Sequence, residues 1–418
     1  MARPMTIPTL RASEHLHDVR YEIRGALARR AEQIERAGHE IVKLNIGNPG
    51  AFGFRMPESM RVAIVQNLHQ ADPYSHQKGI FAAREAVVMQ QQDRGVMDVS
   101  ADDVFIGNGV SELIMLAMRA LLNPGDEVLV PSPDYPLWTA SVVIHGAKAV
   151  HYPCRPERGY VPDPEEIERL VTDKTRAIVV INPNNPSGAV YPRVVLEAIA
   201  GIAERRHLVL CADEIYDEML YDGAEFTPLA TLARHTLCLT FSGLSKVYRA
   251  CGLRVGWLVF SGEREHARDY LQAVELLASL RLCSNVPGQF AVQTALGGHQ
   301  SIFELTRPGG RLHATRAALL AAVRNSRWLS LEPAPMGAMY GFIRVHAERL
   351  PGGVAGFDDQ AFALDLLERK HVLVAPGSSF NVPYRDHFRV TFLPDAEQMT
   401  DVCGRIESLL DEYAVPPS

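Results

Sequence analysis

The sequence predicts an α/β protein with a mainly parallel central sheet, helices on both of its faces, and a smaller α+β part. Two observations carry this prediction. From about residue 104 to residue 260, short apolar runs alternate with segments of helical spacing, and strand–helix–strand repetition specifies a parallel sheet. After residue 260 the pattern changes to long amphipathic helices followed by a few strands. A chain of 418 residues is long enough for both parts.

Five short apolar runs have the length and composition of buried strands. They are residues 104–106, 127–130, 148–151, 177–181 and 208–212. Segments of helical spacing lie between them, such as 112–122 and 194–206. In sheets of this kind ligands bind at the carboxyl ends of the strands. We therefore expect the functional side chains in the loops that follow these runs.

The C-terminal part has its own set of predicted elements. They are helices over 264–280, 310–323 and 395–413 and strands over 338–345, 372–375 and 388–392. The segment before residue 54 is too short to fold alone and is expected to pack with this part. The prediction is thus a large domain over 55–300 and a small domain made of 1–54 and 301–418.

Composition narrows the functional class. Hydrophobic residues make up 47% and charged residues 22%, and the formal net charge is −7. This balance is typical of a globular enzyme and argues against a nucleic-acid or membrane-surface partner. No apolar run reaches the roughly 20 residues that span a bilayer. The six cysteines form no CxxC pair, which favours free thiols in a reducing, cytoplasmic compartment.

A lysine between small hydroxyl residues is the first candidate for chemistry. Lys246 ends the run Ser-Gly-Leu-Ser-Lys that starts at Ser242, and Arg254 follows eight positions later. A nucleophilic amine needs partial desolvation, and small residues with an arginine can hold a phosphate beside it. This pattern is what covalent attachment of pyridoxal 5'-phosphate (PLP) requires. The alternative is a surface lysine in a basic loop.

A glycine-rich turn after the first strand favours a phosphate site. Gly107-Asn-Gly-Val110-Ser111 leads from that strand into a helix, and free amides at a helix N-terminus attract anions. It lacks the third glycine of a dinucleotide-binding fingerprint, so NAD binding has weak support. The structural alternative is a capping turn in which Ser111 is the N-cap residue.

Polar residues follow the two most apolar strands. Asn185 lies in the turn Asn-Pro-Asn-Asn-Pro-Ser-Gly after 177–181, and could donate to a ring oxygen of a cofactor. Asp213 comes directly after 208–212, where burial of a carboxylate requires a positive partner such as a protonated pyridine nitrogen. Tyr216 could bond the same ring oxygen as Asn185. Each residue has a structural alternative: Asn185 could lie in an ordinary loop, Asp213 could cap a helix, and Tyr216 could be a core tyrosine.

These motifs together resemble the class I/II aminotransferases of PLP fold type I, over nearly the full chain. The resemblance rests on Asn182-Pro-Asn-Asn-Pro-Ser-Gly, Asp213-Glu-Ile-Tyr, Ser242-Gly-Leu-Ser-Lys and Gly252-Leu-Arg-Val-Gly-Trp. Within that family the chain is most similar to the bacterial glutamate–pyruvate (alanine) aminotransferases. No metal site is expected: the only HxH pair, His15-Leu-His17, is remote from these motifs.

The resemblance implies the following cofactor contacts. Lys246 binds PLP covalently and moves the proton at the reacting carbon, and Asp213 holds the ring nitrogen. Asn185 and Tyr216 bond the ring oxygen, and Tyr135 stacks on the ring face. The residues implied for the phosphate are Val110, Ser111, Ser242, Ser245 and Arg254, with Tyr74 reaching the phosphate of the neighbouring subunit. The family often has a hydroxyl three positions before the lysine, where this chain has a glycine, and Ser242 stands one position further back. Shared sites imply a homodimer.

The resemblance also implies where the substrate binds. Arg389 grips the α-carboxylate, for which its planar fork is suited, with Gly47 and Asn185 beside it. Its alternative role is to close a surface strand. Tyr21 and Arg24 are the candidates that shape the side-chain pocket.

The predicted function is ping-pong transamination between L-alanine/pyruvate and 2-oxoglutarate/L-glutamate, with amino acids and 2-oxo acids as the partners. Three alternatives remain at this stage. The first is transamination of another amino acid, such as valine, aspartate or an aromatic one. The second is a PLP-dependent C–S β-lyase, and the third is a non-catalytic PLP-sensing domain.

Overall fold

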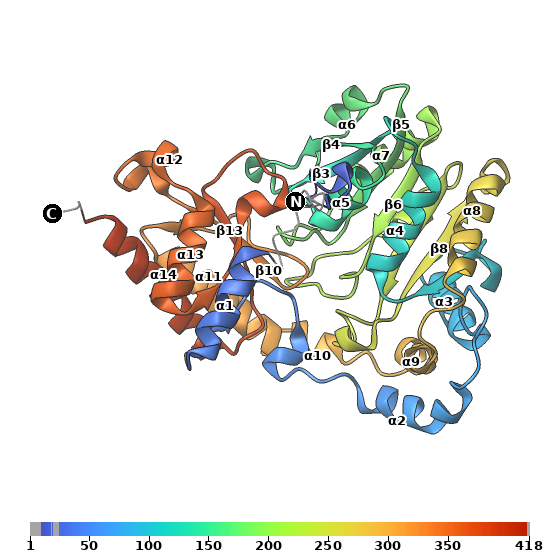
Figure 1. The fold of residues 1–418 in the computed structure, drawn as a ribbon, viewed down its shortest axis with the longest axis horizontal. Coiled ribbons are helices and arrows are strands. Elements are labelled where there is room, and N and C mark those ends of the chain that lie inside the picture. The colour runs from blue at the N-terminus through green and yellow to red at the C-terminus, as the bar shows by residue number, and fades with distance from the viewer. Residues whose placement is uncertain (1–9, 18, 20–24, 416–418) are drawn as a thin grey trace, which may run out of the picture.

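The computed structural model describes residues 10–17, 19 and 25–415, and its larger part is built on one seven-stranded sheet (Figure 1). The strand order is β2-β8-β7-β6-β5-β3-β4. The strands are β2 (Val104–Gly107), β3 (Glu127–Ser132), β4 (Lys148–Pro153), β5 (Thr175–Ile181), β6 (Val209–Asp213), β7 (Leu237–Gly243) and β8 (Gly256–Gly262). All neighbours are parallel except those of β8, which runs antiparallel to β2 and β7. The predicted mainly parallel sheet is confirmed.

Helices cover both faces of this sheet because alternate side chains of its apolar strands point to opposite sides. Ile181 and its neighbours at alternate positions of β5 pack with one group of helices, whereas Ile178 and Val180 pack with the other. The first group is α4 (Val110–Leu121), α5 (Pro136–Val143) and α8 (Arg268–Leu280); the second includes α3 (Phe81–Asp93), α6 (Pro164–Leu170) and α7 (Arg193–Arg206). Burial on both faces explains why these strands read as continuous apolar runs.

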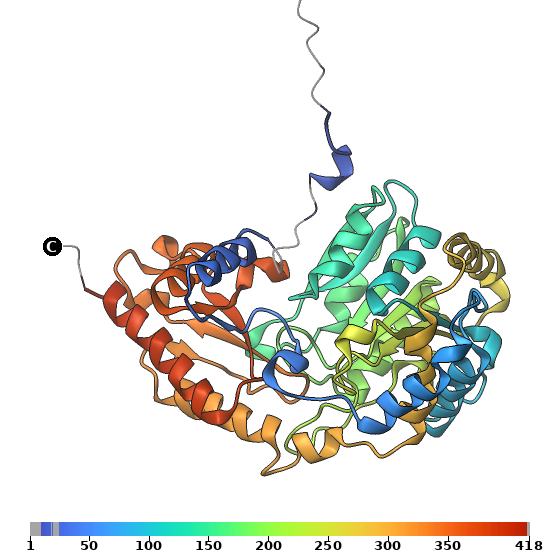
Figure 2. The same ribbon diagram turned by 60° about the horizontal axis from the view of Figure 1, so that its bottom comes forward.

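A second, four-stranded antiparallel sheet forms the core of the C-terminal part, with the order β12-β13-β10-β9. Its strands are β9 (Leu329–Ser330), β10 (Tyr340–Val345), β12 (Ala375–Pro376) and β13 (His387–Thr391). The helices of this part are α10 (Ile302–Thr306), α11 (Arg311–Asn325), α12 (Gly353–Gly356), α13 (Asp359–Lys370) and α14 (Ala396–Tyr413). Figure 2 shows them set apart from the larger sheet.

The N-terminal segment packs with the C-terminal part. Strand β1 (Val42–Lys43) pairs in parallel with β11 (Val372–Leu373), and helix α1 (Ala26–Arg36) contacts α13. The chain then crosses to the larger part, where α2 (Glu58–Asn67) packs on α9 (Val286–Gly297). This crossing is visible in both views of the ribbon (Figures 1 and 2). The domain boundaries at residues 54/55 and 300/301 stay a prediction.

The helix-capping roles considered for Ser111 and Asp213 are wrong. Helix α4 begins at Val110 and its N-cap is Gly109, at φ +86°, so Ser111 lies inside the first turn and does not cap it. Asp213 caps no helix, since the residues after β6 form turns. Both polar side chains therefore lack the structural role that competed with a functional one. Among the described residues, no helix has the length and apolar character needed to cross a membrane.

Candidate active site

A cavity of about 640 Å³ lies at the carboxyl ends of β5, β6 and β7, the edge at which a parallel sheet binds its ligands. Its lining is Ile46, Gly47, Asn48, Val110, Ser111, Tyr135, Ile181, Asn185, Asp213, Ile215, Tyr216, Ser245, Lys246, Cys251, Gly252, Arg254, Tyr340 and Arg389. The volume is within the range of sites for small molecules. Residues from three strand ends of the large sheet thus meet residues of the small sheet.

Most of the residues predicted for the site lie in this lining. They are Gly47, Val110, Ser111, Tyr135, Asn185, Asp213, Tyr216, Ser245, Lys246, Arg254 and Arg389. Ser242 lies buried within β7 and is not part of the lining, and Tyr74 is 77% exposed on another face of the chain. Tyr21 and Arg24 lie outside the described residues.

Asp213, the last residue of β6, is a buried carboxylate that points into the cavity. It is 3% exposed, and its Oδ2 accepts a hydrogen bond from Trp138 Nε1 at 2.9 Å. Its other oxygen, Oδ1, is buried and has no hydrogen bond of ordinary geometry. Burial raises the pKa of Asp213 to about 6, although the Trp138 N–H, the Ile215 backbone and Lys246 each oppose the shift. A positive group beside Oδ1 would satisfy this carboxylate.

Lys246 lies in the loop after β7 and reaches across the cavity. Its Nζ donates to the carbonyl oxygen of Gly47 at 2.6 Å. The glycine three positions before it is required by packing, because a Cβ on Gly243 would lie 2.8 Å from Gly256 Cα and 2.7 Å from Val255 O. This contact explains why the chain has no hydroxyl residue at that position.

The N-terminus of α4 and Arg254 form a small cradle. The glycines at this point leave space that an added side chain would fill. A Cβ on Gly109 would lie 2.3 Å from Arg254 Nη2, and one on Gly256 would lie 2.6 Å from the backbone nitrogen of Val110. Free amides at a helix start, a guanidinium and the Ser111 hydroxyl are donors that suit a phosphate. We call Gly109, Val110, Ser111 and Arg254 the anion cradle.

Arg389 extends from β13 to the opposite side of the cavity and is 2% exposed. Its Nη1 donates to Asn185 Oδ1 at 2.8 Å, and its Nη2 donates to the carbonyl oxygen of Asn45. The guanidinium lies over two rings, with its Cζ 4.4 Å from the centre of Tyr340 and 4.7 Å from that of Phe380. The arginine is therefore a buried cation held by dipoles and aromatic faces, which suits it to bind a carboxylate.

Two buried tyrosines join the cavity's two sides. The hydroxyls of Tyr216 and Tyr340 lie 2.8 Å apart, and their rings meet edge to face. Burial raises the pKa of Tyr216 well above its ordinary value, and the Tyr340 hydroxyl raises it further. Tyr216 is accordingly a neutral hydrogen-bond donor.

Sequence reasoning missed Tyr340, Trp138 and Cys251. Tyr340 begins an ordinary strand, and nothing in its local sequence separates it from a core tyrosine. Trp138 stands three residues after Tyr135, and its first-turn position in α5 is the one signal that could have indicated it. The structure describes no cluster of three or more His, Cys, Asp or Glu side chains that could hold a metal ion within residues 10–17, 19 and 25–415.

The chain is similar to known proteins over nearly its whole length. The family model for aminotransferase class I and II matches residues 39–406. The glutamate–pyruvate aminotransferase of Escherichia coli K12 is 46% identical over 401 residues, covering 96% of this chain and 98% of that protein. The alanine aminotransferase of Mycobacterium tuberculosis H37Rv is 46% identical over 402 residues, covering 96% and 92%.

Solved structures have the same fold as this chain. A crystal structure of an aminotransferase from Escherichia coli has a TM-score of 0.95 at 45% identity, covering 98% of this chain and 100% of that one. An alanine aminotransferase from Pyrococcus furiosus has a TM-score of 0.89 at 35% identity, covering 96% and 100%. The chain belongs to the aminotransferase class I and II family and has the fold type I architecture of that family.

Enzymes of this family depend on PLP, and the cavity fits that group. Asp213 Oδ1 is a buried oxygen without a well-formed hydrogen bond, as a carboxylate facing a ring nitrogen would be. The anion cradle, in which a Cβ at Gly109 or Gly256 would collide, has space and donors for the phosphate.

Proposed function

We propose that this protein transfers the amino group between L-alanine/pyruvate and L-glutamate/2-oxoglutarate, with PLP bound covalently to Lys246. The observation that carries the proposal is the buried Asp213 carboxylate, which faces the same cavity as Lys246 and the substrate arginine candidate Arg389. The choice of substrates is supported by the relatives named glutamate–pyruvate and alanine aminotransferase, at 46% identity over nearly the whole chain.

The cofactor, when bound, supplies an aldehyde that accepts amines and a cationic ring that withdraws electrons from the substrate Cα. Asp213 would keep the ring nitrogen protonated, because its carboxylate gains a positive partner only in that state. Asn185 and the neutral Tyr216 hydroxyl would donate to the ring oxygen, and Tyr135 would cover one ring face. The apolar side chains of Ile181 and Ile215 also line the cavity and would help to exclude water from it.

The anion cradle would hold the phosphate through the amides of Val110 and Ser111, the Ser111 hydroxyl and the Arg254 guanidinium. Ser245 also lines the cavity. Ser242 has no access to this space from within β7, so its predicted phosphate contact has no support here.

At the substrate end, Arg389 would bind the α-carboxylate and so orient the Cα–H bond toward Lys246. Lys246 Nζ would then act as the base that removes the Cα proton and returns it to the cofactor's C4' carbon, beyond the amino nitrogen. In the first half-reaction alanine donates its amino group and leaves as pyruvate. In the second, 2-oxoglutarate accepts that amino group and leaves as glutamate. The Lys246 contact with the Gly47 carbonyl would be exchanged for contact with substrate.

We also propose a homodimer with shared sites. Tyr74 is 77% exposed and lines a second cavity of about 310 Å³ together with Ile80, Val286 and Phe290. This cavity borders helices α2, α3 and α9, where exposed apolar side chains such as Val65 gather. The resemblance to the family implies that, in such a dimer, the partner's Tyr74 would reach the anion cradle. The cytoplasmic location and the pocket roles of Tyr21 and Arg24 stay predictions.

A half-reaction screen tests the substrate proposal. The purified protein loaded with PLP is mixed with each of the twenty amino acids in turn, and the absorbance of the cofactor is followed. We expect alanine and glutamate to convert the cofactor fastest, with pyruvate and 2-oxoglutarate reversing the change. Release of pyruvate from cystathionine without any keto acid would instead identify a C–S β-lyase.

Borohydride labelling tests the covalent link. Reduction of the loaded protein should attach the cofactor to residue 246, and Lys246→Ala should lower turnover by at least about 1,000-fold because the proton-transfer amine is gone. Lys43→Ala, which removes a surface lysine paired with Glu35, is the matched control and should keep full activity. Normal turnover of the Lys246 variant would refute the proposal.

A further inference from the structure

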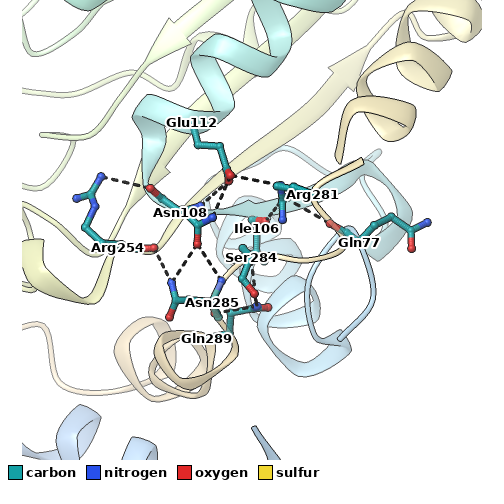
Figure 3. Close-up of polar contacts among 9 residues, drawn as sticks. All are labelled: Gln77, Ile106, Asn108, Glu112, Arg254, Arg281, Ser284, Asn285 and Gln289. Carbon is teal, nitrogen blue, oxygen red and sulfur yellow. Dashed lines mark hydrogen bonds and ion pairs between the residues drawn. The ribbon is translucent and has the colours of Figure 1, made fainter. Parts of the chain in front are cut away.

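A polar network lies directly behind the anion cradle, outside the cavity lining (Figure 3). At its centre is Asn108, in the turn between β2 and α4. The Asn108 backbone N–H donates to Glu112 Oε2 at 2.7 Å, and its side-chain Nδ2 donates to Glu112 Oε1 at 2.9 Å. Asn108 Oδ1 accepts from the backbone N–H of Asn285 at 2.9 Å. The turn that presents the free amides of α4 is therefore held from both directions.

Asn285 has two separate tasks in this network. Its Oδ1 accepts from the backbone N–H of Gly288 at 3.0 Å and so caps helix α9. Its Nδ2 donates to the carbonyl oxygens of Arg254 at 2.9 Å and Leu253 at 3.2 Å. One side chain thus connects the start of α9 to the backbone of the arginine in the cradle.

Arg254 needs such support because its backbone is in the left-handed region, at φ 53° and ψ 52°. Residues other than glycine seldom adopt this conformation. Its guanidinium is held at the other end: Nη1 donates to Cys251 O at 3.0 Å and Nη2 to Asn108 O at 3.3 Å. Asn108 and Asn285 therefore contact Arg254 at its guanidinium and at its backbone respectively, as Figure 3 shows.

Glu112 introduces a negative charge near the helix start, where it would oppose a phosphate. Arg281 offsets this charge, since its Nε lies 3.4 Å from Glu112 Oε1. Arg281 Nη2 also donates to the carbonyl oxygen of Ile106, at the end of β2, at 3.0 Å. The network is close to neutral, so the anion cradle keeps its positive potential.

We infer that Asn285, acting with Asn108, is a positioning residue for the cofactor phosphate: it holds Arg254 and the start of α4 in the geometry that binds the anion. The inference rests on the proposed PLP site. It assigns to Asn285 a role beyond capping α9, and the two roles use different atoms of the same side chain, which makes them separable by mutation.

Two variants of Asn285 separate these roles. Asn285→Ser keeps a side-chain oxygen suited to cap α9 but removes the Nδ2 donor that reaches Arg254, whereas Asn285→Ala removes both. Equilibrium binding of PLP to the cofactor-free full-length protein is measured by fluorescence titration, in parallel with pyridoxal, which lacks the phosphate. We expect both variants to bind PLP about tenfold more weakly than the unmodified protein, from loss of hydrogen bonds that hold a charged group. Binding of pyridoxal should change less than twofold.

The matched control is Asp395→Ala, which removes the N-cap of α14 far from the cavity. It should lower thermal stability while leaving the PLP affinity unchanged. The inference is overturned if Asn285→Ser binds PLP as tightly as the unmodified protein, or if PLP and pyridoxal lose affinity equally. Failure of the unmodified protein to bind PLP at all would refute the proposed function itself, which separates the two outcomes.

Discussion

The two ends of the cavity are built in different ways. At the cofactor end, Asn185, Asp213 and Lys246 follow β5, β6 and β7, three neighbouring strands of one parallel sheet. At the substrate end, Arg389 comes from β13 of the small sheet, and Gly47 follows the N-terminal strand β1. Adjacent strand ends must meet by the geometry of a parallel sheet, whereas the substrate end exists only because two separate parts of the chain pack together.

Hydrogen bonds between cavity-lining residues connect these ends. Lys246 Nζ donates to Gly47 O, one of the Tyr216 and Tyr340 hydroxyls donates to the other, and Arg389 donates to Asn185. In each pair one partner belongs to the cofactor end and the other to the substrate end. A substitution at one end of the cavity should therefore leave the other end unchanged, unless it alters one of these contacts.

Arg389→Lys should give the largest difference between its effect on the substrate end and its effect on the cofactor end. Lysine keeps the charge but not the planar fork that binds a carboxylate through two parallel hydrogen bonds. We expect kcat/KM for alanine to fall about 100-fold, equivalent to about 2.7 kcal/mol, while the cofactor absorbance spectrum is kept. Steady-state kinetics and spectra of the loaded protein measure both. Arg385→Lys, at an exposed ion pair with Asp358, is the control and should be unchanged. Loss of cofactor together with substrate affinity would contradict the separation.

Trp138→Phe should affect the cofactor end alone. Phenylalanine keeps a ring against Phe241, which Trp138 meets edge to face at 5.2 Å, but removes the N–H donated to Asp213. That hydrogen bond lowers the pKa of Asp213, which burial has raised to about 6, so its loss raises this pKa further. The carboxylate is then protonated over a wider acid range and cannot pair with a cationic ring. We expect kcat to fall about tenfold.

The pH dependence is the diagnostic measurement for Trp138→Phe. The loss of PLP affinity should be greatest below about pH 6, where the pKa difference between the two proteins has its full effect, and should shrink toward pH 8, where Asp213 is charged in both proteins. The KM for alanine should stay within about twofold. An affinity loss that does not vary with pH would argue against action through Asp213.

Tyr340→Phe tests a contact that crosses between the ends. The variant loses the hydroxyl beside Tyr216 but keeps the aromatic face under Arg389. We expect kcat to fall about threefold with little change in KM, as one hydrogen bond between neutral groups is removed. Tyr340→Leu also removes the cation–π contact and should raise the KM for alanine about fivefold. A raised KM in the phenylalanine variant, measured by the same kinetics, would show that the hydroxyl acts on the substrate end.

Glu214→Gln should affect neither end and is expected to have the smallest effect. Glu214 adjoins Asp213 but points away from the cavity, where its Oε1 accepts from the Leu229 N–H at 2.9 Å. Burial raises its pKa to about 8, and the charge of Asp217 adds to the rise. The folded state therefore keeps a proton that the unfolded chain releases above about pH 4.5, so stability falls as the pH rises toward 8.

Glutamine keeps the acceptor for Leu229 and cannot ionise. We expect the apparent Tm of Glu214→Gln to exceed that of the unmodified protein by about 2 °C at pH 8.5 and to match it at pH 5. Thermal unfolding at the two pH values measures this difference. Glu157→Gln, at an exposed position, should show no such dependence, and equal Tm values at pH 8.5 would contradict the expected burial cost.

Five of the seven strands of the large sheet could be predicted from the sequence because their physical cause is local, whereas β7, which leads to Lys246, and β8 were not predicted. Apolar runs such as 177–181 have no polar side to expose, so they specify strands buried on both faces. The position of Asp213 directly after such a run indicated its burial before any tertiary contact was known. The same reasoning could not find Tyr340, since a tyrosine at the start of a strand in the small sheet looks like any core residue.

Sequence alone determined the parallel sheet, its ligand-binding edge and the residue types that arrive there, because strand periodicity and loop position are short-range properties. Only the tertiary structure decided three contacts. They are the oxygen of Asp213 to which Trp138 donates, the aromatic ring that lies against the Arg389 guanidinium, and the hydrogen bonds by which Asn285 holds Arg254. The contacts of Trp138 with Asp213, Tyr340 with Arg389 and Asn285 with Arg254 join residues that are 75, 49 and 31 positions apart in the chain. Their geometry is set by how distant segments pack and not by any local pattern.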